Sequence, residues 1–67
     1  MTSIGEDFPK EQARVRRILE IYRSIGPEGT FGAMMIEDTL RRADEAAISG
    51  DIVEILRSYQ ELKEIQE

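Results

Sequence analysis

The chain has 67 residues, of which 14 are acidic and 9 are basic, and it contains neither cysteine nor histidine. A domain of this length buries only about 60% of the surface that its unfolded chain exposes, so its core is thin. The absence of cysteine excludes a disulfide, and the absence of both residue types excludes the usual structural zinc site. Because small domains without such supports are commonly stabilised by a partner, we expect the chain to self-associate.

The missing residue types also exclude several kinds of catalysis and ligand binding. Ser-His-Asp and Cys-His arrangements both need histidine, as does the Glu-x-x-His metal motif of helical bundles. The sequence also contains no glycine-rich loop of the kind that binds phosphate. We therefore expect no enzymatic activity, no cofactor and no bound metal.

The sequence predicts no contact with a membrane and no secretion. The longest apolar run, Ala33 to Ile36, is far too short to cross a bilayer. Residues 1–7 lack the charged and apolar regions of a secretory signal. We therefore expect a cytoplasmic protein.

The spacing of the apolar residues predicts an all-α protein, since no stretch shows the alternation that is typical of strands. Residues 1–7 are polar and predict a flexible N-terminal tail. The rest, 8–67, predicts a single helical domain with helices over about 9–25, 31–48 and 52–65.

The first predicted helix begins at Pro9, because proline is favoured at the first helical position, and Asp7 or Phe8 serves as its cap. It ends before Gly26 and Pro27, which favour helix termination. Its apolar side chains span an arc about 160° wide, which suits a helix that packs against two others. The arc consists of Val15, Ile18, Leu19, Ile21, Tyr22 and Ile25.

The second predicted helix follows Thr30, a suitable N-cap residue. Its buried face contains mainly small side chains, so a neighbouring helix can approach closely. That face consists of Ala33, Ile36, Leu40, Ala43 and Ala47, with Ala46 at its edge.

The third predicted helix follows a very short connection. Gly50 suits a left-handed C-cap, and Asp51 with Glu54 three residues later forms a variant of the capping box. Such a short connection predicts that the second and third helices pack as an antiparallel hairpin, with dimerisation completing the three-helix unit. The apolar face of the third helix consists of Ile52, Ile55, Leu56, Tyr59 and Leu62.

Three large apolar residues, Phe31, Met34 and Met35, point away from the predicted buried face of the second helix. Partner surfaces are rich in Phe and Met, so these residues predict an interface. The alternative is that the first helix folds over this end and buries them in the core. Tyr22 and Arg14, from the apolar arc of the first helix, complete the predicted interface, and the stem of Arg14 either covers apolar surface or brings its charge to a carboxylate.

The net charge of −5 is unevenly distributed, since residues 26–67 carry ten acidic and four basic side chains. This excess disfavours direct binding to nucleic acid and leaves a basic protein as a possible partner. An acidic surface can also serve solubility alone. The acidic residues of this surface are Glu37, Asp38, Asp44, Glu45, Glu54 and Glu61.

These observations favour a small helical protein–protein interaction module, with a second copy of the chain as its partner. The alternative is an acidic inhibitor or adaptor from a phage or mobile element, which counters host defence by binding a basic surface of a nucleic-acid-handling protein. Salt distinguishes the two, because apolar association persists at high salt whereas charge mimicry weakens. The sequence matches no motif of a known family.

Overall fold

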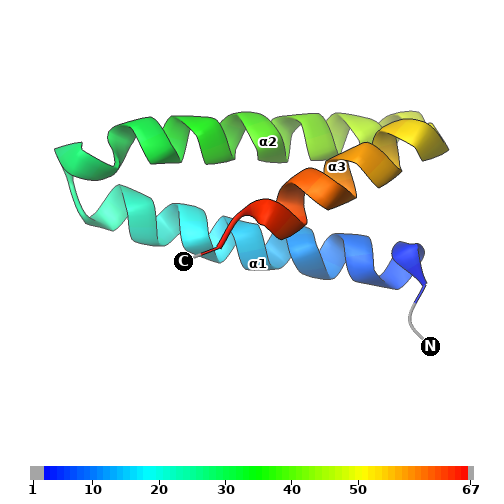
Figure 1. Ribbon diagram of the computed structural model, residues 1–67, viewed down its shortest axis with the longest axis horizontal. Helices are drawn as coiled ribbons and strands as arrows, with labels where there is room; N and C mark the ends of the chain where they lie inside the picture. The colour runs from blue at the N-terminus through cyan, green and yellow to red at the C-terminus, as the bar shows by residue number, and fades with distance from the viewer. Residues whose placement is uncertain (1–2, 67) are drawn as a thin grey trace.

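The computed structural model describes residues 3–66, and within this range it contains only helices and turns. The prediction of an all-α fold with three helices is therefore confirmed. Two long helices lie side by side, and the third crosses them diagonally (Figure 1). The elements are α1 (Ile4–Ser24), the short 3-10 helix η1 (Pro27–Gly29), α2 (Thr30–Ser49) and α3 (Ile52–Glu64).

The first helix starts earlier than predicted, so the assignment of a flexible tail to residues 1–7 is wrong from Ile4 onward, while residues 1 and 2 lie outside the described range. Ile4 and Phe8 are one turn apart and both pack on the core, where Phe8 is only 5% exposed. Burial of these two side chains stabilises an additional turn of helix. Pro9 therefore lies inside α1 rather than at its first position, and Phe8 is a core residue rather than a cap.

The pairing of α1 with α2 is fixed by a small apolar core and by two ion pairs at its edge. Arg16 binds Asp44 at 2.9 Å, and Arg23 binds Glu37 at 2.8 Å. The second pair lies seven residues further along α1 and seven residues back along α2, so the two helices run in opposite directions. The buried core consists of Phe8, Val15, Ile18, Leu19, Ala33, Ile36, Leu40, Ala43 and Leu62.

The turn between α1 and α2 depends on two glycines. Gly26 has a φ of 88°, which favours glycine. Gly29 packs so closely that an added Cβ would lie 2.2 Å from the carbonyl oxygen of Tyr22. Thr30 is the first residue of α2, so its assignment as the N-cap is wrong, and Gly29 occupies that position without a side-chain bond.

The connection to α3 follows the prediction at its caps. Gly50 adopts the left-handed conformation with a φ of 71°, and Asp51 accepts a hydrogen bond of 3.0 Å from the N–H of Val53. The predicted capping box is only half formed, because the N–H of Asp51 donates to Ser49 Oγ at 3.2 Å.

The buried faces near this connection differ from the predicted ones. Ala46 is buried and Ala47 is exposed, because α3 packs on the Ala46 side of α2. Ile52 and Leu56 are exposed at 59% and 49%, whereas the small Ser58 is buried. The helix therefore rests on α2 through a narrower face than its apolar pattern predicts.

Substitution of Leu62 tests the role of α3 in the core. Leu62 is completely buried, whereas Leu56 of the same helix is 49% exposed. We expect Leu62→Ala to lower the free energy of unfolding by about 3 kcal/mol. The control Leu56→Ala is expected to lower it by less than about 1 kcal/mol. Urea unfolding at one fixed protein concentration, followed by circular dichroism, measures both, and equal losses would contradict the placement of α3.

Two glycine substitutions are expected to have opposite effects. Gly29→Ala forces its Cβ against the Tyr22 carbonyl and should destabilise the protein by more than about 2 kcal/mol. Gly5→Ala lies in an exposed part of α1, where the nearest atom to an added Cβ is Ser3 Oγ at 3.6 Å. It should stabilise the helix by about 0.5–1 kcal/mol. Thermal midpoints that shift in the same direction would show that the α1–α2 turn is less tightly packed than described.

Candidate interaction surface

The two long helices extend beyond the end of α3. At about 1.5 Å per residue, the 13 residues of α3 span about 20 Å, whereas the 21 residues of α1 span about 32 Å. The last turn of α3 lies against Arg14, whose guanidinium donates hydrogen bonds of 2.8 Å to the carbonyls of Leu62 and Ile65. Beyond this point the second half of α1 and the start of α2 have no third helix against them (Figure 1).

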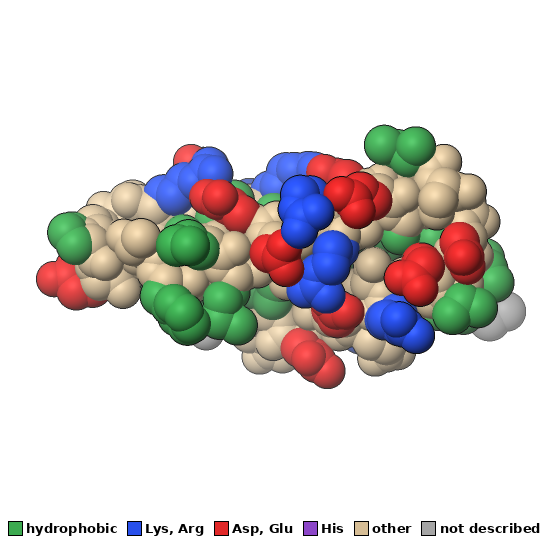
Figure 2. Space-filling view, turned by 90° about the horizontal axis from the view of Figure 1, so that it is seen from above, with side chains coloured by type: hydrophobic (Ala, Val, Ile, Leu, Met, Phe, Trp, Pro, Cys, Tyr) green, Lys and Arg blue, Asp and Glu red, His purple; other side chains and the backbone are tan. Residues whose placement is uncertain are grey.

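At this uncovered end, five large apolar side chains are between 45% and 75% exposed. Hydrophobic side chains gather over the start of α2, separated by charged residues from those at the opposite end (Figure 2). We call the five exposed side chains at this end of α1 and α2 the open-end patch. It consists of Ile21 (45%), Ile25 (54%), Phe31 (75%), Met34 (63%) and Met35 (58%).

The patch residues of α2 wrap around the start of that helix. Phe31 is one turn from both Met34 and Met35, which are adjacent in the chain and diverge by about 100°. Met35 lines a hollow on the α3 side, whereas Met34 lines a different hollow with Arg23 and Glu37. Ile21 follows Arg14 by two helical turns and therefore lies on the side of α1 that α3 covers further back. Between the two helices, the Tyr22 ring packs closely against Gly32, where an added Cβ would lie 2.6 Å from Cε2 of the ring.

A hollow of about 280 Å³ lies at the centre of this end, where α3 would continue if it were longer. Tyr22 and Gly32 line it between the two long helices, Met35 belongs to the patch, and Ile65 closes it at the end of α3. The hollow therefore joins Met35 of the patch to the α1 side of this end.

The five residues of the predicted interface differ in exposure and in role in the structure. Phe31, Met34 and Met35 are exposed, so the alternative in which α1 buries them in the core is wrong. Tyr22 is half-buried and forms part of the hollow between the helices. Sequence reasoning assigned Ile21 and Ile25 to the buried arc, and that assignment is wrong because α3 does not reach them.

Arg14 has a structural role in the folded chain. Its guanidinium binds the carboxylate of Glu11 in addition to the carbonyls of Leu62 and Ile65. Carbonyl groups at the end of a helix lack helical donors, and a cation there also interacts favourably with the helix dipole. Arg14 therefore caps α3 from a neighbouring helix, and its guanidinium is bound within the chain.

The carboxylates of the predicted acidic surface are paired with arginines of the same chain. Arg41 hydrogen-bonds Asp38 and, with the nearby charge of Arg42, lowers the pKa of that carboxyl below its ordinary value. The other five carboxylates also lie within ion-pair distance of an arginine. The pairs are Glu37 with Arg23, Asp38 with Arg41 and Arg42, Asp44 with Arg16, Glu45 with Arg41, Glu54 with Arg57, and Glu61 with Arg42.

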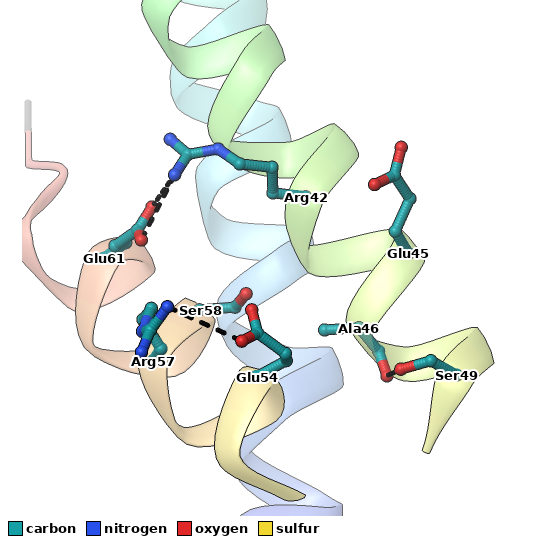
Figure 3. A pocket seen from close by; sticks show the side chains of 8 residues that line it. All are labelled: Arg42, Glu45, Ala46, Ser49, Glu54, Arg57, Ser58 and Glu61. Carbon is teal, nitrogen blue, oxygen red and sulfur yellow. Dashed lines mark hydrogen bonds and ion pairs between the residues drawn. The ribbon is translucent and has the colours of Figure 1, made fainter. Parts of the chain in front are cut away.

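Another hollow, of about 410 Å³, lies between α2 and α3 (Figure 3). Its floor contains the small side chains of Ala46 and Ser58. Arg42 lies at one end with Glu61 at 2.9 Å, and at 3.5 Å Arg57 pairs with Glu54. Its charged groups thus bind one another, and its lining is more polar than that of the open-end patch.

No group of three or more acidic, histidine or cysteine side chains within residues 3–66 has the arrangement needed to hold a metal ion. In the same range, no helix has the length and apolar content needed to cross a membrane. No protein family, curated protein or solved structure matches the chain.

Removal of the Arg14 guanidinium should loosen the end of α3. Arg14→Met keeps an apolar stem but loses both hydrogen bonds to the α3 carbonyls, so we expect the free energy of unfolding to fall by about 2 kcal/mol. Arg17→Met, an exposed position of the same helix, should change it by less than about 0.5 kcal/mol. Hydrogen exchange should also accelerate at the amides of Lys63 and Glu64 in Arg14→Met alone. Equal stability of the two variants would contradict the cap.

Proposed function

We propose that this chain is a small non-enzymatic protein–protein interaction module whose binding surface is the open-end patch. The observation that carries the proposal is a group of five large apolar side chains exposed at one end of the molecule. Ile21 and Ile25 lie beyond the end of α3 at Glu64, and the other three lie off the buried face of α2. Soluble proteins rarely expose a large contiguous apolar surface unless a partner covers it.

The composition of the patch supports the same function. Phe31, Met34 and Met35 are residue types that are enriched at interfaces, and methionine adapts its shape to a partner. The core described above is formed without any of these three side chains. Their exposure is therefore not a requirement of the fold, and binding gives it a physical reason.

In this proposal the rest of the chain supports the patch. The α2–α3 pair, as the antiparallel hairpin predicted from the sequence, and the Arg14 cap hold α3 in place so that its end stays fixed beside the hollow. The cytoplasm is the compartment in which we expect the module to act.

The acidic inhibitor or adaptor receives less support. A protein that imitates a phosphate backbone presents carboxylates that are free to bind basic groups of its target. Here each of the six predicted carboxylates already pairs with an arginine of the same chain, from Glu37 on α2 to Glu61 on α3. Binding to a basic partner would have to break or share these pairs, which weakens the gain from charge attraction.

Capture of binding partners by full-length variants tests the proposed surface. We expect an affinity-tagged wild-type chain to recover a partner from an extract of cells that also produce the untagged chain, and Phe31→Glu/Met34→Glu to recover at least about tenfold less, because charges replace apolar contacts. The control Ile48→Glu places a charge on an apolar residue that is 87% exposed but lies near the other end of α2, and it should recover the partner as wild type does.

Recovery in about 1 M salt completes this test, since charge attraction is then screened beyond about 3 Å. Persistence of the partner at high salt supports the apolar surface. If wild type and both variants retain the partner equally and the partner is lost at high salt, the open-end patch is not the binding surface. That result would favour the acidic inhibitor or adaptor.

A further inference from the structure

We infer that the partner of the open-end patch is a second copy of this chain, which packs its own open end against the first in a two-fold symmetric dimer. This inference rests on the proposed function and names its partner. In the dimer, the α1–α2 end of each copy occupies the side of the other that α3 leaves uncovered, so four helices surround one shared apolar layer. The argument rests on the area of the patch, on the distribution of charge and on the symmetry of such a contact.

The area of the patch matches the need of a homodimer. A large apolar side chain exposes on the order of 150–200 Å², so five side chains that are 45% to 75% exposed present on the order of 500 Å² on each copy. A standard interface buries about 800 Å² on each partner, and about 65% of a homodimer interface is apolar. If the partner copy covers all five side chains, including Met34 on the Glu37 side of α2, the patch supplies about the apolar share of one such interface.

The distribution of charge permits two copies to meet at this end. Residues 1–42 contain seven acidic and seven basic side chains, so the net charge of −5 belongs entirely to residues 43–67. All five residues of the patch lie in the neutral segment. Self-association through any surface dominated by the acidic segment would bring like charges together.

Most of the charged groups that flank the patch are paired within the chain. Arg23 binds both Glu20 and Glu37, so this group on α1 and α2 is already paired. Asp38, on the turn after Met35, is paired with the arginines that follow it on α2. Glu64 reaches the rim of the hollow from the acidic segment, and its position at the edge leaves it in contact with water. The interface thus has an apolar centre and a mildly acidic rim, in which Glu20, Glu37 and Asp38 are paired with arginines of the same chain.

A symmetric contact also explains why the association would stop at two copies. In a two-fold interface each copy uses the same patch, so both patches are covered and no apolar end remains for a third copy. The molecule is 36 Å long, and contact at the open ends places the Gly50 turns of the two copies at opposite extremes of the dimer. At physiological salt this separation is several times the screening length of about 8 Å.

Sedimentation of the purified full-length chain over a wide concentration range tests this inference. We expect wild type to form a dimer whose dissociation constant changes less than about threefold between low and high salt, because apolar burial drives it. Met35→Glu should raise the dissociation constant at least about 30-fold, since the substitution occurs on both sides of the interface. The matched control Ile48→Glu should leave it unchanged and should show the same helicity as Met35→Glu.

The absence of cysteine from the chain allows a second and independent test. Single substitutions Phe31→Cys, Met34→Cys and Met35→Cys can form disulfides only between copies, and at least one of them should link quantitatively on oxidation, because some patch residues must lie near the symmetry axis. Ile48→Cys should not link beyond the level of random collision. If Met35→Glu loses its helical circular dichroism signal, the cysteine variants still test the interface.

Three results would overturn the inference. The first is a wild-type chain that stays monomeric at all concentrations. The second is a dimer that Met35→Glu and Phe31→Glu leave intact. The third is preferential linkage in a mixture of Met35→Cys with Ile48→Cys, which would show a head-to-tail contact. If the chain is monomeric but captures a different protein from extract through the patch, the proposed function still holds. If neither sedimentation nor capture depends on the patch, the proposed function is contradicted as well.

Discussion

The difference in length between the helices is the constraint from which the other features of this protein follow. Two helices of about 30 Å cannot be covered by a third of about 20 Å, so part of their shared apolar face must be exposed. The caps at the two ends of α3 decide which part this is. Asp51 fixes its start at the Gly50 turn, and Arg14 fixes its end against the middle of α1. Together they leave the opposite end open.

Most of the fold could be predicted from the sequence because it depends on local signals. Gly50 and Asp51 mark the α2–α3 boundary through backbone conformation and capping, which are properties of a few adjacent residues. The alanine-rich face of α2 is likewise visible from helical spacing alone. The N-terminal turn escaped prediction because Pro9 is a strong local signal for a helix start. Burial of Phe8 against the core, a tertiary effect, outweighs that signal.

The candidate site could be predicted only in part, because exposure depends on what lies opposite a residue. Phe31 and its two methionine neighbours lie off the buried face of their own helix, so their exposure is visible from α2 alone. Ile21 and Ile25 lie on the correct face to be buried, and only the position where α3 ends shows that nothing covers them. Arg14 is the reverse case, because its partners are backbone carbonyls about fifty residues away, which leave no trace in the side-chain pattern.

The open-end patch exists only when the chain is folded, and this links association to stability. Its residues come from both sides of the α1–α2 turn, and the close contact of Gly29 with the Tyr22 carbonyl brings the two helices into register there. An unfolded chain has no such surface, so a partner that binds the patch stabilises the folded state by mass action. For a chain of 67 residues without disulfides, whose core alone supplies only about 3–5 kcal/mol, this contribution is large. A longer α3 would cover Ile21 and the hollow within one chain. The shorter helix instead makes the covering of that area depend on the concentration of a partner.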